Sequence, residues 1–261
     1  MASPGRIVII GGTGLIGTRV ATRLRAAGVE VLQASPASGV DALTGEGLDA
    51  ALDGAAAVIE VTNPASLEPV AALDFFRTTA RNLAQAGRRA GVGHHLALSI
   101  VGVDRMPDNG YFAAKLAQEQ GLRESGLPWT VLRATQFMEF IGAIADAAEV
   151  DGIVRLSGGQ FQPIAADDVA EALARAALSP PVSGILEIAG PERAPLDEFA
   201  RRRLALAGDP RRVLRDPEAR YFGARVEERS LTPLGPAWLG RIDLDAWAAG
   251  LAPPLSLPRT A

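Results

Sequence analysis

The chain has 261 residues, of which 48% are hydrophobic and 21% charged, with a net charge of -4. These values are typical of one large α/β domain, or of a domain with a small appendage, and give no reason to expect a nucleic-acid partner or an anionic membrane. There is no cysteine, which excludes disulfides and a cysteine-ligated metal. The two histidines, His94 and His95, are adjacent, and in a strand their side chains point to opposite faces, so no metal site is expected.

Apolar runs of strand length alternate with helical patterns along most of the chain. Strands are expected near residues 6–10, 30–33, 57–61, 95–99, 130–133 and 185–188, and helices near 15–27, 67–90, 112–125, 137–148 and 166–178. Gly28, Gly91 and Gly126 each follow an expected helix, where a left-handed residue commonly ends the helix. This alternation predicts an α/β fold with a parallel sheet covered on both faces. The first apolar run is too short for a signal peptide or a membrane span, so a cytoplasmic location is expected by default.

A glycine-rich segment, 11–17, follows the first expected strand and leads into the first helix. Glycines at 11, 14 and 17 allow a tight turn, a close approach of the backbone to a pyrophosphate, and tight packing of helix on strand. A structural glycine turn is the alternative, but the strand before and the helix after favour a Rossmann-type doubly wound sheet. The residues predicted to bind the dinucleotide here are Gly11, Thr13, Gly14, Leu15, Ile16 and Gly17.

The segment after the second expected strand bears on the choice of cofactor. NAD-binding sites of this kind usually carry an acidic residue there, which binds the ribose hydroxyls. This chain has Ser35 and Ser38 instead, and no carboxylate until Asp41. Two hydroxyls can donate hydrogen bonds to a 2′-phosphate that a carboxylate would repel. The sequence therefore favours NADP(H), with NAD(H) as the alternative.

Lys115 is the only lysine in the chain, and it stands four residues after Tyr111, one of only two tyrosines. Residues four apart on a helix share a face, so the phenol and the ammonium can enter one site. There the ammonium, together with an oxidised nicotinamide, would lower the pKa of the phenol. Ser99 ends the fourth expected strand, where its hydroxyl can hold a carbonyl oxygen. These three residues are the predicted catalytic groups for carbonyl reduction. An amphipathic helix with a snorkelling lysine is the alternative.

These motifs resemble the short-chain dehydrogenase/reductases, and more closely their atypical NmrA-like NAD(P)H-binding branch. The resemblance rests on the glycine pattern, on Ser99, on the Tyr111–Lys115 spacing and on the stretch 132–137, and it covers roughly residues 5–190. It implies that Tyr111 is the general acid/base, that Lys115 binds the nicotinamide ribose and tunes Tyr111, and that Ser99 steadies the reacting oxygen. One departure is Ala134, where the family usually has proline.

The resemblance also implies further contacts with the cofactor. Thr62 and Asn63 are expected to lie along it, although a plain turn at Asn63-Pro64 explains Asn63 about as well. The segment Thr135, Gln136 and Phe137 is expected to pass the nicotinamide. The catalytic asparagine of the family has only a loose match, Asn82.

After about residue 190, proline, glycine and arginine become frequent and clear strand runs disappear. We therefore expect a Rossmann dinucleotide-binding domain at 1–190, with part of the substrate pocket from about 137–165, and a small C-terminal substrate lobe and tail at 191–261. The expected pocket walls are mostly apolar, which favours an uncharged or aromatic substrate. The residues expected in them are Phe137, Met138, Phe140, Ile141, Tyr221, Phe222 and Trp238.

The sequence predicts an NADP(H)-dependent oxidoreductase that transfers hydride to or from a small carbonyl or conjugated organic substrate. Many proteins of the NmrA-like branch have lost the tyrosine and act as NADP(H) sensors, whereas this chain keeps Ser99, Tyr111 and Lys115. A non-catalytic redox sensor is one alternative. A redox-neutral epimerase, dehydratase or cyclase on the same scaffold is the other. The substrate and the oligomeric state stay open.

Overall fold

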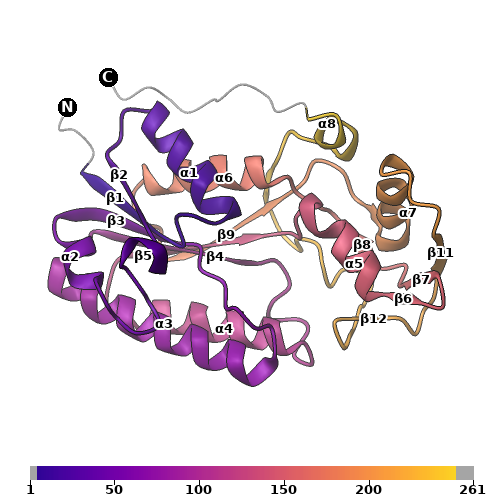
Figure 1. Cartoon of the computed structure of the whole chain (residues 1–261), viewed down its shortest axis with the longest axis horizontal. Coiled ribbons are helices and arrows are strands. Elements are labelled where there is room, and N and C mark those ends of the chain that lie inside the picture. Colours follow the sequence, from indigo (N-terminus) through magenta and orange to yellow (C-terminus); the bar gives the residue numbers. More distant parts are fainter. Residues whose placement is uncertain (1–4, 251–261) are drawn as a thin grey trace.

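The computed structural model describes residues 5–250, and its central element is a seven-stranded sheet (Figure 1). All neighbouring strands in this sheet are parallel. Their order is β2 (Val31–Ala34), β1 (Arg6–Ile10), β3 (Ala55–Glu60), β4 (His94–Ile100), β5 (Trp129–Ala134), β9 (Gly184–Ala189) and β14 (Trp238–Leu239). The inner strands are apolar on both sides, as a sheet covered on both faces requires.

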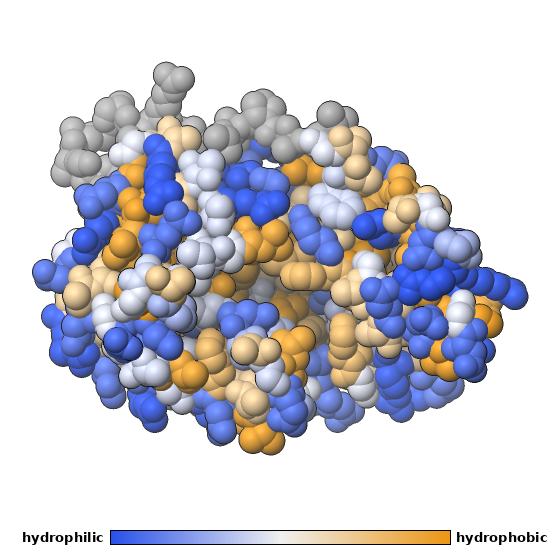
Figure 2. Space-filling model, in the orientation of Figure 1, coloured by the Kyte–Doolittle hydropathy of each residue, from blue (hydrophilic) through white to orange (hydrophobic). Residues whose placement is uncertain are grey.

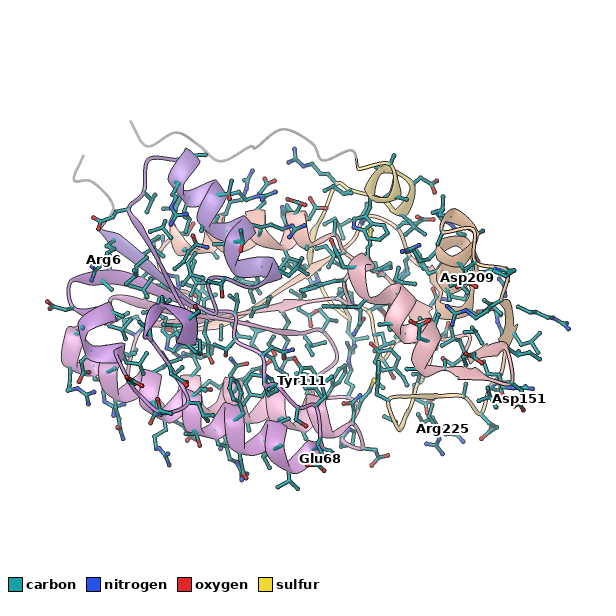
Figure 3. The ribbon with its side chains drawn as sticks, in the orientation of Figure 1. Arg6, Glu68, Tyr111, Asp151, Asp209 and Arg225 are labelled. Atoms are coloured by element: carbon teal, nitrogen blue, oxygen red, sulfur yellow. The ribbon has the colours of Figure 1, made fainter. Side chains whose placement is uncertain are left out.

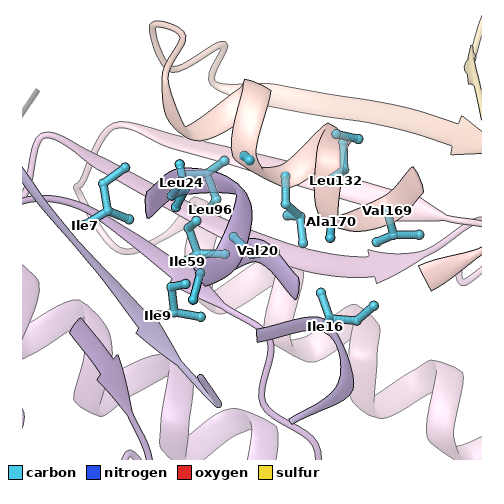
Figure 4. Packing of buried hydrophobic residues seen from close by; sticks show 14 of the residues in the cluster. Ile7, Ile9, Ile16, Val20, Leu24, Ile59, Leu96, Leu132, Val169 and Ala170 are labelled. Atoms are coloured by element: carbon cyan, nitrogen blue, oxygen red, sulfur yellow. The ribbon is translucent and has the colours of Figure 1, made fainter. Parts of the chain in front are cut away.

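Helices cover the two faces of the sheet (Figure 1). One face carries α1 (Leu15–Ala26) and α6 (Ala166–Ala177), and the other carries α2 (Leu48–Leu52), α3 (Pro69–Ala90) and α4 (Gly110–Arg123). Alternation along β1 turns Ile7 and Ile9 toward α1, and Val8 and Ile10 toward α2 and α3. Figure 4 shows the first of these cores, where Val20 of α1 packs between the sheet and α6.

The strand order reverses next to β1. The chain runs from β1 outward to β2, then returns to the other side of β1 to form β3. Adjacent parallel strands whose connections leave in opposite directions open a crevice at their carboxyl ends, and ligands bind there in open α/β sheets. Gly11 follows β1, and Thr62 follows β3 after one residue. The fold thus places the glycine segment at the edge where a ligand is expected.

A smaller lobe lies beside the carboxyl ends of the strands, on the right of Figure 1. Three small sheets form in it, with the orders β11-β7-β6, β10-β8 and β12-β13. Its core includes Phe161, Leu196 and Phe199. The elements of the lobe are η2 (Met138–Phe140), α5 (Ile141–Ala147), β6 (Glu149–Val150), β7 (Ile153–Leu156), β8 (Gln160–Phe161), β10 (Ala194–Pro195), α7 (Leu196–Leu206), β11 (Arg212–Arg215), β12 (Arg220–Tyr221) and β13 (Ala224–Arg225).

The predicted α/β fold with a Rossmann-type doubly wound sheet is confirmed, and all six predicted strands form within two residues of their expected ends. Gly28, Gly91 and Gly126 have φ of 79°, 67° and 74°, as expected for helix ends. None of the helices in the described residues combines the length and the apolar character that crossing a membrane requires.

Two expectations about the second half of the chain are wrong. The helix expected over 137–148 begins only at Ile141, because 138–140 form the short 3₁₀ turn η2. Strands do not disappear after residue 190: β11 pairs with β7, and β14 extends the main sheet beside β9. The short elements η1 (Pro36–Ser38) and α8 (Leu244–Ala248) complete the fold. The extended tail expected over 252–258 lies outside the described residues.

Candidate active site

A cavity of about 1020 Å³ opens at the carboxyl ends of the strands, between the sheet and the lobe. Figure 2 shows a hollow at the centre of this face of the molecule. Its volume is at the upper end of the range of about 300–1,000 Å³ for small-molecule sites. It brings together the residues predicted to be catalytic or to bind the cofactor, except Gly17, Ser38 and the loosely matched Asn82. Those lining it are Gly11, Thr13, Gly14, Leu15, Ile16, Ser35, Thr62, Asn63, Ser99, Tyr111, Lys115, Thr135, Gln136 and Phe137.

Three glycines shape one wall of this cavity. Gly11 has a φ of +82°, and a Cβ added there would lie 2.8 Å from the carbonyl oxygen of Val61. A Cβ at Gly17 would lie 2.6 Å from Cα of Gly12, so this glycine lets α1 close on the loop although it does not line the cavity. A Cβ at Gly14 would meet only the carbonyl oxygen of Gly11, at 3.4 Å. The backbone N–H of Gly14 donates to the carbonyl oxygen of Gly11 at 3.1 Å, but the space beside its Cα, where α1 begins, is open to a ligand.

The segment after β2 forms the next part of the wall. Ser35 and Pro36 line it, and the Ser35 hydroxyl is buried without a hydrogen-bond partner within residues 5–250. Ser38 lies outside the lining because its hydroxyl closes a local turn: it accepts from the backbone N–H of Ser35 at 2.9 Å and donates to the carbonyl oxygen of Ser35 at 2.9 Å. Of the two predicted hydroxyls, the one of Ser35 is free to meet a ligand.

Tyr111 lies at the start of α4, in the middle of the molecule in the view of Figure 3. Asn109 caps this helix by accepting a hydrogen bond from the N–H of Phe112 at 3.0 Å. The phenol of Tyr111 donates to Oδ1 of Asn63 at 2.6 Å. Burial raises the pKa of Tyr111 to about 12. Burial is the cause of this shift, and the lowering expected from Lys115 together with an oxidised nicotinamide stays a prediction.

Lys115 lies one helical turn after Tyr111 and is only 5% exposed. Its ammonium donates to the carbonyl oxygen of Leu98 at 2.6 Å and to Oε1 of Gln118, and it lies 4.6 Å from the centre of the Phe76 ring. Burial lowers the pKa of Lys115 to about 8, although the carboxylates of Glu60 and Glu119 oppose this shift. A compact ammonium suits such an enclosed position better than a planar guanidinium does.

Ser99 also lines the cavity, but its hydroxyl donates to Oε1 of Glu119 at 2.6 Å. Glu119 is itself held by two hydrogen bonds of 2.8 Å from Arg133, which also reaches Asp104 at 2.8 Å. A hydroxyl has one proton to donate, so in this arrangement Ser99 can only accept a hydrogen bond from a ligand. Nothing in the local sequence around Ser99 had indicated this ion-pair network.

A buried carboxylate beside the site, Glu60, was also missed by the sequence analysis. It ends β3, is 1% exposed and accepts a hydrogen bond from the Thr62 hydroxyl at 3.2 Å. Burial raises the pKa of Glu60, but its interactions with His95 and Lys115 outweigh this effect and hold the pKa below its usual value. A single acidic residue at the end of an otherwise apolar strand is the signal that could have identified it.

Two of the residues that line the cavity carry buried polar atoms without hydrogen-bond partners among the described residues. In the described part of the chain, neither Oγ1 of Thr135 nor the two side-chain heteroatoms of Gln136 has a hydrogen-bond partner, and all three are buried. Buried polar atoms in proteins almost always have partners, so these fit a polar ligand such as an amide. These buried polar atoms and the open space beside Gly14 make this cavity chemically suited to a dinucleotide that ends in a carboxamide.

The structure also shows where the other residues proposed for the site lie. Asn82 donates to the carbonyl oxygens of Ala42 and Leu43, both at 3.0 Å, and it is Asn63 that contacts Tyr111. Of the expected pocket walls, those that line the cavity are Phe137, Phe140, Tyr221 and Phe222. Met138 and Ile141 lie in the core of the lobe instead, and Trp238 packs against the core beneath α6. No group of three or more potential metal ligands occurs among residues 5–250.

Comparisons with known proteins agree with this geometry. A family model described as NAD(P)H-binding matches residues 11–180. A curated relative, a (4-alkanoyl-5-oxo-2,5-dihydrofuran-3-yl)methyl phosphate reductase from Streptomyces griseus subsp. griseus, is 34% identical over 176 residues. The matched region spans 62% of this chain but only 58% of the relative's length.

Solved structures under 25% identical to the chain show the same fold. A UDP-glucose 4-epimerase from Thermus thermophilus in complex with NAD has a TM-score of 0.64 and 21% identity, with 97% of this chain and 95% of that chain covered. A dTDP-4-dehydrorhamnose reductase from Bacillus anthracis in complex with NADP has a TM-score of 0.67 and 17% identity, with 87% and 88% covered. An NADPH-dependent quinone oxidoreductase from Escherichia coli, complexed with NADPH, has a TM-score of 0.59 and 24% identity, with 80% and 77% covered.

The family model begins at the glycine segment and extends through α6, so it includes both the strand ends that form the cavity and the Tyr111–Lys115 helix. It covers well over half of the chain. The protein therefore belongs to the NAD(P)H-binding family.

Proposed function

We propose that this protein is an NADPH-dependent reductase that transfers hydride to a small, uncharged carbonyl compound or conjugated double bond, with Tyr111 as the proton donor. The proposal rests on the observation that Tyr111 and the glycine loop line the same cavity. Tyr111 contacts Asn63 there, and Lys115 lies on the next turn of the same helix. A dinucleotide on the glycine loop and a phenol within its reach are the parts that such a reduction needs.

Bound NAD(P)H supplies the hydride in this reaction. The open space beside Gly14 at the start of α1 would take its pyrophosphate, and the unpartnered amide of Gln136 would hold its carboxamide. Preference for NADPH is supported by the hydroxyl of Ser35, buried and unpartnered in the described structure at the place where an acidic residue would favour NADH. The carboxylate of Asp41, farther along the cavity wall, accepts a hydrogen bond from the backbone N–H of Leu43.

The role of Tyr111 follows from its protonation. With a pKa of about 12, the phenol keeps its proton throughout the neutral range, which is the state that a general acid for reduction requires. In this role Tyr111 delivers its proton to the substrate atom that becomes electron-rich as hydride adds to its neighbour. Lys115, charged below its pKa of about 8, adds a positive charge one turn away that favours proton release.

Ser99 is proposed to steady the reacting oxygen, as the family resemblance implies, but this requires a movement. Its hydroxyl would have to turn from Glu119 into the cavity before it could donate to a substrate. The Tyr111 hydroxyl donates to Asn63 and would likewise turn to the substrate, while Asn63 holds the ring in place until then. We therefore assign the positioning of the phenol to Asn63 and a secondary role to Ser99.

The charge of the cavity wall supports an uncharged substrate. The curated relative is named for a substrate that carries a phosphate ester. Among the described residues that line this cavity, by contrast, there is no arginine, and the single lysine already donates to Leu98 and Gln118. The cofactor phosphates would lie at the start of α1, whereas an anionic substrate group beside Phe140, Tyr221 and Phe222 would find no cationic partner and would be costly to desolvate. We propose that this chain takes a neutral compound.

Turnover by the variant Tyr111→Phe tests the proposal. NADPH oxidation is measured with a panel of neutral aldehydes, ketones, enones and quinones, and NADPH binding is measured by fluorescence. The variant is expected to lose roughly 100- to 10,000-fold in kcat while its affinity for NADPH stays within about twofold, because the phenol acts on the substrate. Equal turnover by both proteins would refute the role of Tyr111. Tight NADPH binding without oxidation by any compound would favour the sensor instead.

A further inference from the structure

Two hairpins of the smaller lobe share one turn geometry but differ in sequence. The β6–β7 hairpin turns through Asp151 and Gly152, with φ of 52° and 78°. The β12–β13 hairpin turns through Phe222 and Gly223, with φ of 46° and 87°. Two successive left-handed residues are typical of two-residue hairpin turns, in which Asn-Gly and Asp-Gly are strongly preferred. Aspartate tolerates this region, whereas a bulky residue such as phenylalanine is rarely found in it.

Backbone strain of this kind persists where the surroundings enforce it, and it is concentrated at functional sites. The two turns differ in this respect. Phe222 lines the cavity, whereas Asp151 does not and lies at the far end of the lobe from Tyr111 (Figure 3). The unfavourable residue therefore occurs in the turn that borders the candidate active site, and the favourable one in the turn that does not.

The strained turn is anchored. Tyr221, the residue before it, is 7% exposed, and its ring packs edge-on against Phe112 of α4 with centroids 6.4 Å apart. The ring of Phe222 packs edge-on against Tyr221 at 4.8 Å. The hairpin is thus fixed through Tyr221 to the helix that carries Tyr111.

Phe222 itself remains 54% exposed although its neighbour is buried. A second exposed phenylalanine, Phe140, lines the same cavity and stacks on Phe137 at 5.6 Å. Large aromatic side chains left open at a cavity are typical of surfaces that bind an apolar ligand. One of these rings comes from η2 and the other from the β12–β13 turn, so the lobe presents two aromatic rings to a ligand in the cavity.

We propose that Phe222 is a substrate-contacting residue, held by its strained turn so that its ring packs on an uncharged, planar, unsaturated substrate. This inference rests on the proposed function, because it calls the ligand a substrate. The contact between the ring and the ligand does not itself require turnover. The ring supplies apolar area and an aromatic face, and it supplies no group that could balance a charge. Specificity for flat neutral compounds thus originates in the lobe, while proton transfer belongs to α4.

Binding of a neutral aromatic dye tests this proposal. The probe is N-phenyl-1-naphthylamine, and its fluorescence is titrated with the full chain saturated with NADP+. The variant Phe222→Asn is expected to bind the probe roughly tenfold more weakly, because an aromatic contact is lost. Its Tm is expected to stay equal or rise, because asparagine suits the left-handed turn. Phe222→Tyr should restore the affinity, and the matched control Asp151→Asn should leave affinity and Tm unchanged.

The proposal would be overturned if the wild-type protein did not bind the probe, or if Phe222→Asn bound it as tightly as the wild type. A clearly lowered Tm of Phe222→Asn would also overturn it, because the phenylalanine would then be a structural residue. The anionic analogue 8-anilinonaphthalene-1-sulfonate is expected to bind the wild type more weakly than the neutral probe, and tighter binding would contradict the charge argument. The affinity for NADP+ is measured in the same experiment, so that failure of the proposed function can be told apart from failure of this inference. Loss of probe binding in Phe222→Asn in a protein that never oxidises NADPH would leave the contact standing and refute only the reductase.

Discussion

Lys115 shows how much one residue can indicate when its surroundings are known. In a chain whose other basic residues are all arginine, it occupies a position enclosed by the Leu98 carbonyl, the Gln118 side chain and the Phe76 ring. Its charge is retained at neutral pH against the cost of burial, with the help of the carboxylates of Glu60 and Glu119. Such a costly charge beside a cavity is typical of a functional group, since structural lysines are usually exposed.

This burial has a consequence for stability that can be measured. Folding lowers the pKa of Lys115 from its ordinary value of 10.5 to about 8, so between these values the unfolded chain binds a proton that the folded chain lacks. The contribution of Lys115 to the free energy of unfolding therefore rises with pH across this window, by up to about 1.4 kcal/mol per pH unit. Lys115→Met lacks this contribution.

Urea unfolding of wild type and Lys115→Met, from about pH 7 to about pH 10, gives the difference directly. The wild type is expected to gain stability relative to the variant above about pH 8. A difference that stays constant through this range would mean that Lys115 keeps its ordinary pKa in the folded protein.

Part of the site could be predicted from local sequence and part could not. Tyr111 and Lys115 were identified by their spacing on one helix, which depends on neighbouring residues alone. The partners of Ser99 and Lys115 were not, because Glu119 meets Arg133 only after α4 has packed across β4 and β5. Phe222 was named as a wall residue, but its left-handed backbone could not be read from a sequence that favours no such turn.

Two glycines at the junction of β1 and α1, Gly14 and Gly17, have different roles. Gly17 permits packing, since a Cβ there would lie 2.6 Å from Cα of Gly12 and 2.8 Å from its carbonyl carbon. Gly14 leaves room for a ligand, since a Cβ there would meet only the Gly11 carbonyl oxygen, at 3.4 Å. The same substitution should therefore weaken cofactor binding at one position and stability at the other.

Gly14→Ala is expected to leave the Tm nearly unchanged but to weaken NADPH binding by more than about tenfold, because its methyl group enters the cavity. Gly17→Ala is expected to lower stability by about 1–3 kcal/mol, because its methyl group overlaps the loop backbone. Thermal unfolding and fluorescence titration of both variants supply the test. A Gly14→Ala variant that binds NADPH normally would show that the loop does not hold the pyrophosphate.

The six predicted strands all belong to the main sheet. Each carries its own apolar run, because inner strands of a parallel sheet are buried on both faces. Most of the missed strands, among them β12, β13 and β14, have two residues each and no pattern of their own, while β7 and β11 have four. Their pairing depends on partners brought to them by the rest of the fold, as Trp238 is brought beside Ile188 of β9.

At the scale of the whole molecule, the two lobes are joined so that the cavity has one wall from each. Asp168 of α6 accepts hydrogen bonds from the backbone N–H groups of Arg241 and Ile242, at 2.9 Å and 3.0 Å, and so ties the segment after β14 to the Rossmann domain. The overall architecture is shared with an epimerase, a dehydrorhamnose reductase and a quinone oxidoreductase. A fold with such different chemistries does not decide the reaction, so the assignment depends on the residues in the cavity.

Transfer of an isotope from cofactor to product tests that assignment most directly. The protein is incubated with a reducible compound from the neutral panel and NADPH deuterated at both C4 positions of the nicotinamide, with deuterated NADH in a parallel reaction. Mass spectrometry of the product is expected to show one deuterium per molecule, acquired faster from NADPH than from NADH, and Tyr111→Phe is expected to slow this transfer. NADPH that binds to the protein and keeps its deuterium with every compound tested would contradict the account.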